Sequence, residues 1–204
     1  MIQIAAGKVT LEGHMRIPSE ARRFVVFVHG SGSSRHSIRN NFVAEQLEDA
    51  GIGSLLFDLL TEEEDSRREN RFDIPLLTER TNHVLEWVAT QESVPSSGIH
   101  LFGASTGAAA AIQSAARPGS GICSVVSRGG RPDMAGEALG LLKAPCLLIV
   151  GENDPAVLDM NREAQARMSC ENELRVVKGA THLFQEPGAL KTVAQYALDW
   201  IAHH

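Results

Sequence analysis

The chain is poor in cysteine. Its 204 residues include three, Cys123, Cys146 and Cys170. This odd and widely spaced set matches neither the paired spacing of a zinc site nor an even disulfide framework. We therefore expect a reduced, cytoplasmic protein with no metal bound by these thiols.

Long apolar runs are also missing. No stretch approaches the roughly 18 apolar residues that a membrane-spanning helix requires. The opening segment, MIQIAAGKVTLEGHM, has no basic stretch followed by an apolar run, so we predict no signal peptide. Both absences argue against a membrane as partner.

Basic charge is in deficit, because 19 lysine and arginine residues stand against 25 acidic residues and give a formal charge of −6. This balance offers no attraction to nucleic acid or to an anionic membrane. The densest basic group, Arg67, Arg68 and Arg71, lies within an acidic stretch. We therefore predict that residues 60–72 form an irregular, solvated loop.

Internal repeats and low-complexity linkers are absent as well. A chain of this length, with 43% hydrophobic residues, is large enough for one core. We therefore predict a single domain over residues 1–204.

Short apolar runs alternate with helical patterns along the chain. Ile2, Ile4, Val9 and Leu11 alternate with other residues around Gly7, which predicts an N-terminal hairpin. The later runs are typical of strands buried on both faces, and they cover residues 24–28, 53–57, 99–102, 122–126, 146–150 and 174–177.

Helical periodicity fills the gaps between these runs. Asp73 and Pro75 suit the first turn of a helix that continues through Val88. Further apolar stripes cover residues 157–168 and 190–201. The alternation predicts a three-layer α/β fold, with helices on both faces of a mostly parallel sheet and no large lid. Ligands bind at the carboxyl ends of the strands in such sheets, so we expect the chemistry there.

A G-x-S-x-G motif occupies residues 103–107, between an apolar run and the alanine-rich segment 108–111. A strand that turns directly into a helix forces the residue at the turn into a strained conformation and exposes its side chain. Gly103 and Gly107 relieve the crowding on either side of Ser105. The context predicts Ser105 as a nucleophile, whereas the plainer interpretation is a glycine-rich turn capped by serine.

A serine hydroxyl needs a base to take its proton. His182 follows the run 174–177 through a short loop and precedes the last helix, so it belongs to a strand's carboxyl end. The alternative is an ordinary loop histidine. The other candidates are terminal or lie within predicted elements: His14, His83, His100, His203 and His204.

A third group must orient the imidazole and stabilise its charged form. Asp154 follows the run 146–150 and is our candidate, with Glu152 as the fallback. Asp159 is expected inside the next helix. The alternative role for Asp154 is an N-cap before Pro155.

Acyl transfer also requires hydrogen-bond donors for the negative oxygen of the transition state. We predict the backbone N–H of Thr106 as one donor and that of Ser31 as the other, with Gly32 as the alternative to Ser31. The rival interpretation of this loop is a dinucleotide fingerprint beginning at Gly30. The third glycine of that fingerprint would fall at Arg35, so the pattern is incomplete.

Four segments together resemble the α/β-hydrolase superfamily, and within it the small dienelactone-hydrolase-like group. They are His29-Gly-Ser-Gly32, Gly103-Ala-Ser-Thr-Gly107, Gly151-Glu-Asn-Asp154 and Gly179-Ala-Thr-His182. The resemblance covers nearly the whole chain. It implies a serine esterase that acts on small-molecule acyl substrates without a metal or cofactor, as a monomer or small homo-oligomer.

One departure from that group affects the expected substrate. Dienelactone hydrolases use a cysteine nucleophile, and position 105 is serine. A general esterase-like activity is therefore expected instead. Gly32, Arg35, Arg128 and Arg131 are candidate substrate-binding residues, because an arginine holds a carboxylate through paired hydrogen bonds. Exposed turns are the alternative for these arginines.

Two other kinds of function remain open at the level of sequence. A thioesterase or peptidase would use the same three residues with another leaving group. A non-catalytic binding protein would keep the fold without the reaction, because fold alone does not establish function. The short segments between strands predict an open, shallow site suited to small acyl substrates.

Overall fold

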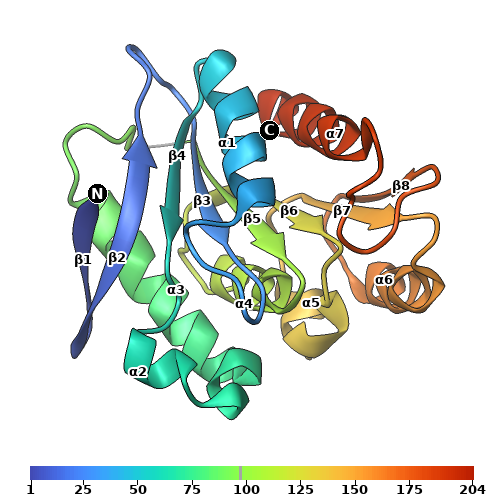
Figure 1. Cartoon of the computed structure of the whole chain (residues 1–204), viewed down its shortest axis with the longest axis horizontal. Coiled ribbons are helices and arrows are strands. Elements are labelled where there is room, and N and C mark those ends of the chain that lie inside the picture. The colour runs from blue at the N-terminus through green and yellow to red at the C-terminus, as the bar shows by residue number, and fades with distance from the viewer. Residues whose placement is uncertain (97) are drawn as a thin grey trace.

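A computed structural model describes residues 1–96 and 98–204. The sheet has eight strands in the order β1-β2-β4-β3-β5-β6-β7-β8 (Figure 1). Strands β3 to β8 are parallel to one another, whereas β1 and β2 are antiparallel to their neighbours. The predicted α/β architecture with a mostly parallel sheet is confirmed.

The N-terminal hairpin is formed by β1 (Ile2–Ala6) and β2 (Val9–Arg16). Gly7 has φ +67°, a conformation that glycine adopts without steric cost. Strand β2 then pairs with β4 and attaches the hairpin to the parallel sheet.

The parallel strands coincide with the apolar runs of the sequence, and most extend one or two residues beyond them. Strand β8 is an exception to the prediction of strands buried on both faces. It lies at the edge of the sheet, most of its residues are half-buried, and Val176 is 38% exposed. The strands are β3 (Phe24–Val28), β4 (Gly53–Phe57), β5 (Ile99–Ala104), β6 (Ile122–Arg128), β7 (Cys146–Gly151) and β8 (Asn172–Val177).

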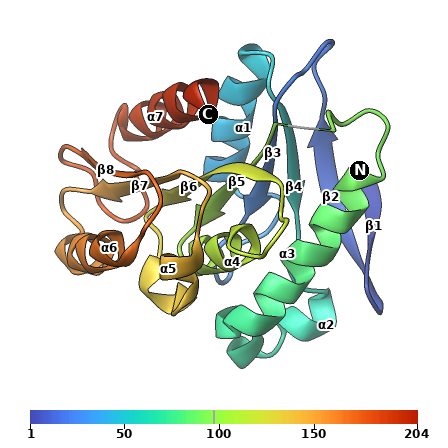
Figure 2. The same cartoon turned by 180° about the vertical axis from the view of Figure 1, so that it is seen from behind.

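Helices cover both faces of the sheet. On one face lie α1 (Ile38–Asp49) and α7 (Ala189–His203), which contact each other (Figure 1). The opposite face carries α3 (Ile74–Ala89), α4 (Thr106–Ala115), α5 (Ala138–Leu141) and α6 (Pro155–Arg167), as the reverse view shows (Figure 2). Among the described residues, no helix has both the length and the apolar character needed to cross a membrane.

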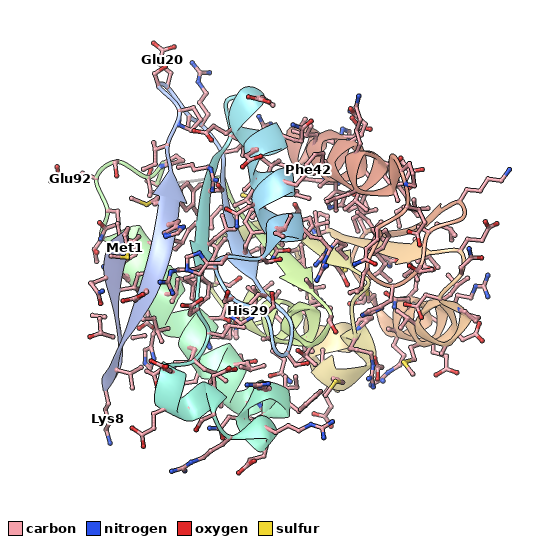
Figure 3. All side chains as sticks on the ribbon, in the orientation of Figure 1. Met1, Lys8, Glu20, His29, Phe42 and Glu92 are labelled. Carbon is pink, nitrogen blue, oxygen red and sulfur yellow. The ribbon has the colours of Figure 1, made fainter. Side chains whose placement is uncertain are left out.

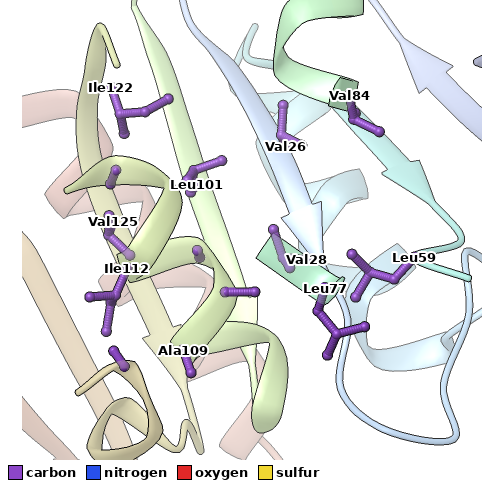
Figure 4. Packing of buried hydrophobic residues seen from close by; sticks show 14 of the residues in the cluster. Val26, Val28, Leu59, Leu77, Val84, Leu101, Ala109, Ile112, Ile122 and Val125 are labelled. Carbon is purple, nitrogen blue, oxygen red and sulfur yellow. The ribbon is translucent and has the colours of Figure 1, made fainter. Parts of the chain in front are cut away.

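The larger core lies between the sheet and α3 and α4. Side chains from both layers interdigitate there, with Val26 and Leu101 from the strands facing Val84 and Ile112 from the helices (Figure 4). All four are fully buried. This burial fixes the two helices against the sheet and so determines where the strand ends and helix starts lie relative to one another.

Residues 60–72 are more regular than the sequence suggested. They include α2 (Glu62–Asp65) and a 3₁₀ helix, Arg68–Phe72. Thr61 and Glu64 form a reciprocal capping box at the start of α2. Glu64 also accepts a hydrogen bond of 2.6 Å from the buried Arg80 of α3. Local capping and this ion pair explain why the prediction of an irregular loop is wrong.

Helix α4 approaches the sheet closely at two glycines. A Cβ atom at Gly103 would lie 2.8 Å from the backbone nitrogen of Ala108. A Cβ atom at Gly107 would lie 2.8 Å from the carbonyl carbon of His29. Backbone atoms cannot move aside as a flexible side chain can, so only glycine allows this approach.

We predict that Gly103→Ala destabilises the fold by about 3 kcal/mol or more, because the added methyl group overlaps the backbone of α4. Thermal unfolding measured by circular dichroism would show this as a lower Tm. Gly140→Ala is the matched control, since the nearest atom to a Cβ there is 3.9 Å away. Equal Tm values for the two variants would contradict the close approach.

Candidate active site

The three principal candidates lie at the carboxyl edge of the sheet. Ser105 follows β5, Asp154 follows β7 and His182 lies in the loop after β8. Because β5, β6, β7 and β8 are parallel neighbours, their carboxyl ends share one edge. The fold therefore brings these segments, which are distant in sequence, to the same side of the molecule.

Ser105 has a strained backbone with φ 50° and ψ −124°. Its N–H donates to the carbonyl oxygen of Arg128 at 3.3 Å, and its own carbonyl oxygen accepts from the N–H of Arg131 at 3.0 Å. Such a conformation persists only where the surroundings impose it. Neighbouring chain segments hold Ser105 at the turn between β5 and α4, with its side chain free of any capping bond.

Asp154 and His182 form a short hydrogen bond of 2.6 Å between Oδ2 and Nδ1. Asp154 is the N-cap residue of α6, yet its side chain makes no capping hydrogen bond. Its carboxylate is directed to the imidazole instead and is 15% exposed, whereas the imidazole is 40% exposed. A carboxylate at Nδ1 favours the proton on that nitrogen, so Nε2 is left as the acceptor.

The other acidic candidates have different partners. Glu152 accepts a hydrogen bond of 2.7 Å from the backbone N–H of Gly179 and braces the start of the histidine loop. Asp159 lies in α6 and forms an exposed ion pair with Arg162. Among the described residues, Asp154 is thus the carboxylate that reaches His182.

The histidine loop is anchored by Phe184, which has φ 55° and a buried side chain. A bulky residue in the left-handed region is strained, and here its ring is held in the core beside α7. Gly129, with φ +49°, allows the loop to lie against the end of β6, because a Cβ there would be 3.3 Å from the carbonyl oxygen of His182. Burial of Phe184 therefore fixes the position of His182 two residues away.

Ser105 and His182 are both adjacent to the end of β6. Ser105 bonds to the backbone of Arg128, and a Cβ at the next residue, Gly129, would lie 3.5 Å from Cε1 of His182. No hydrogen bond joins the Ser105 hydroxyl to the imidazole among the described contacts. Such bonds are often long in unliganded enzymes and tighten only with substrate.

The predicted oxyanion donors are in direct contact. The backbone N–H of Ser31 donates to Oγ1 of Thr106 at 3.0 Å, and Thr106 is buried. The N–H of Thr106 is the first of α4, and the leading N–H groups of a helix have no partner within it. Gly30 allows the loop to lie against Ser105, because a Cβ at position 30 would lie 2.8 Å from Ser105 Cβ.

His29 is a site residue whose role the sequence did not reveal. Its Nε2 accepts from the N–H of Leu59 at 3.0 Å, so Nδ1 carries the proton and donates to Gly30 O at 2.9 Å. Burial lowers the pKa of this imidazole and favours its neutral form. His29 (labelled in Figure 3) therefore ties the oxyanion loop after β3 to the segment after β4. Its position directly before Gly30 was the available signal.

The candidate substrate-binding residues have different surroundings. Arg35 is paired with Asp58 and Glu12, so two carboxylates already neutralise its guanidinium, and its role in substrate binding stays a prediction. The guanidinium of Arg131 is likewise occupied by Asp133, at 2.8 Å. Arg128 has no carboxylate within 4.0 Å in the described part of the chain. Gly32 has φ +68° and shapes the turn of the loop.

A polar cavity of about 480 Å³ lies between the loop after β3 and the segment after β4. Its lining includes His29, Ser33 and Asp58. Within residues 1–96 and 98–204, no group of three or more histidine, cysteine, aspartate or glutamate side chains is arranged to hold a metal ion.

Comparison with known proteins places this geometry in a family. A model described as an alpha/beta hydrolase domain matches residues 21–203. A dienelactone hydrolase from Anabaena variabilis is 45% identical, with a TM-score of 0.96 over 100% of this chain and 96% of that one. A serine hydrolase homologue from Coxiella burnetii, at 19% identity, has a similar fold, with a TM-score of 0.80 over 97% of this chain and 95% of that one.

Longer relatives also occur. Two Mycobacterium tuberculosis proteins, from strains CDC 1551 and H37Rv and provisionally named phosphoribosyl transferases, are each 54% identical over 203 residues. The match covers 100% of this chain but 46% of each relative, so the chain spans about half the length of these proteins. The family model and the Anabaena structure together show that this chain belongs to the α/β-hydrolase superfamily, with a fold like that of dienelactone hydrolase.

Proposed function

We propose that this chain is a serine hydrolase that cleaves carboxylic esters, with Ser105 as nucleophile, His182 as general base and Asp154 as the residue that orients it. The observation that carries the proposal is the 2.6 Å hydrogen bond between Asp154 Oδ2 and His182 Nδ1. A carboxylate that bonds to an imidazole instead of capping its helix, at the same edge of the sheet as a strained serine, matches the requirements of nucleophilic catalysis.

The reaction follows from the tautomer of His182. With the proton on Nδ1, the Nε2 lone pair accepts the Ser105 hydroxyl proton while Oγ attacks the ester carbonyl carbon. The tetrahedral intermediate collapses to an acyl-enzyme when the alcohol leaves with the proton from Nε2. Water, deprotonated by the same nitrogen, then attacks the acyl carbon, and the serine is released with its proton restored.

The negative oxygen of the intermediate is stabilised by two backbone N–H groups. One is the N–H of Thr106 at the positive end of α4, and the other is that of Ser31. In the unliganded site the Ser31 N–H bonds to the Thr106 hydroxyl. That hydroxyl has no acceptor for its own proton among the described contacts, so it is a further donor available to the oxyanion.

The mycobacterial relatives are named for a different activity, phosphoribosyl transfer. Those proteins are about twice as long as the stretch they share with this chain. In this chain, that stretch contains Ser105, Asp154 and His182. We therefore infer hydrolysis for this stretch, and we assign none of its residues a role in phosphoribosyl transfer. Thioester or amide bonds would require the same groups, and the 40% exposure of His182 favours small substrates that reach an open site.

Covalent labelling tests the nucleophile. We expect a fluorophosphonate probe to label the wild-type protein at one site and to leave Ser105→Ala unlabelled, because only an activated serine reacts with such probes. Intact-protein mass spectrometry measures the adduct. The Ser33→Ala variant is the control and should label normally. Undiminished labelling of Ser105→Ala would reject the assignment.

Replacement of Asp154 tests the role of its hydrogen bond to His182. Asp154→Asn should lower kcat for a 4-nitrophenyl ester by about 10³- to 10⁴-fold, because an amide favours the wrong imidazole tautomer. Glu152→Gln is the matched control and should change kcat little, since Glu152 bonds to a backbone N–H instead. Steady-state kinetics on both variants measure the two kcat values. A larger loss in Glu152→Gln would show that the acid has been misassigned.

The Thr106 hydroxyl gives a further test. Thr106→Val keeps the shape of the side chain but removes the bond to the Ser31 N–H. We expect kcat to fall about 10- to 100-fold with little change in KM, because the lost donor acts on the transition state. Thr106→Ser should restore most of the rate. An increased kcat in Thr106→Val would mean that the hydroxyl only competes with substrate for the Ser31 amide.

A further inference from the structure

Arg128 is a buried cation without a counter-charge. It ends β6, is 8% exposed, and donates from Nη2 to Oδ1 of Asn40 at 3.2 Å. Its Nε is buried and has no hydrogen-bond partner, and no carboxylate lies within 4.0 Å of its guanidinium in the described residues. An unpaired buried charge is costly, so a position that retains one calls for an explanation.

Arg39 adds a second positive charge at the same place. It lies in the first turn of α1, next to Asn40, and its Nε is also buried without a partner. Burial, together with the charge of Arg39, lowers the pKa of Arg128 to about 10. Two guanidinium groups that repel each other therefore share one region in which the described residues supply no carboxylate to either.

The start of α1 reinforces this positive region. Ser37 caps the helix, and the first turn contains no acidic residue. The N-terminus of a helix favours negative charge, yet this one carries Arg39 in its first turn. Helix α1 also directly follows the oxyanion loop, so the region adjoins the candidate active site.

Arg128 itself connects the region to the nucleophile. Its carbonyl oxygen accepts the N–H of Ser105 at 3.3 Å, and a Cβ at the next residue, Gly129, would lie 3.5 Å from Cε1 of His182. A ligand group bound by the Arg128 side chain would therefore belong to a molecule whose other end reaches Ser105. Arg35 and Arg131 differ, because each already has a carboxylate partner.

We propose that Arg128 and Arg39, together with Asn40 and the first turn of α1, bind an anionic oxygen group of the ester substrate, either a carboxylate or a phosphate. The proposal rests on the proposed ester hydrolysis at Ser105 and specifies its substrate class. The missing counter-charge comes from the substrate, and binding it places the ester carbonyl at the nucleophile. Guanidinium groups suit this purpose, because their planar donors match both kinds of anion.

Two esters that differ in one terminal group test the proposal. Mono-4-nitrophenyl glutarate carries a carboxylate where 4-nitrophenyl pentanoate carries a methyl group. We expect wild-type kcat/KM, corrected for spontaneous hydrolysis, to favour the glutarate. Arg128→Gln should reduce this preference by about 10- to 100-fold and Arg39→Gln by a smaller factor, since each removes a charged hydrogen-bond donor. Arg162→Gln removes an exposed arginine of α6 and should leave the preference unchanged.

Calorimetric titration separates this proposal from the proposed hydrolysis. Glutarate and inorganic phosphate are titrated into the wild-type protein, Ser105→Ala and Arg128→Gln. Binding to the first two and a loss in Arg128→Gln support the anion site, even if neither ester is hydrolysed, and the tighter anion identifies the chemical class. Absence of binding to wild type, or an equal loss of kcat/KM for both esters, overturns it. If Arg128→Gln does not fold, Arg39→Gln decides by the same criteria.

Discussion

The strained turn at Ser105 is the constraint on which the rest of the site depends. A residue with φ 50° directly between a strand and a helix is tenable only because its backbone is bonded on both sides. The same turn brings α4 to backbone contact distance from the sheet, and Gly103 and Gly107 permit that approach. Packing of the apolar core behind α4 supplies the free energy that maintains the strain.

The surrounding loops are held by polar contacts on one side of the site and by a buried aromatic ring on the other. His29 joins the loop after β3 to the segment after β4, and Ser31 joins it to α4 through Thr106. On the other side, the buried ring of Phe184 holds the loop that carries His182. Further contacts fix each loop beyond these points, since Arg35 pairs with Asp58 and the N–H of Gly179 bonds to Glu152.

Much of this structure could be predicted from the sequence because its signals are local. The six apolar runs became strands, and the glycines around Ser105 marked the turn that the structure contains. Asp154 was the candidate because of its place after a strand, even though its pattern equally suited an N-cap. Its carboxylate bonds to the imidazole of His182, and this contact depends on the position of a loop 28 residues further along the chain.

The features that were missed depend on contacts between distant segments or on mixed local signals. Helix α1 was not singled out, because the polar Asn40 occupies a buried position of its inner face. The capping box at Thr61 was present in the sequence but was obscured by the charged residues around it. The pairing of Arg35 and the isolation of Arg128 could not be inferred, because both depend on which side chains the sheet order makes neighbours.

The neutral imidazole of His29 makes the site sensitive to acid. Its folded pKa is lowered from 6.5, so the unfolded chain takes up the proton first as the pH falls below that value. The free energy of unfolding therefore falls on acidification. The contacts affected are those by which His29 joins the loop after β3 to the segment after β4. A proton on Nε2 would expel the N–H of Leu59, and the oxyanion loop would loosen before the apolar core is affected.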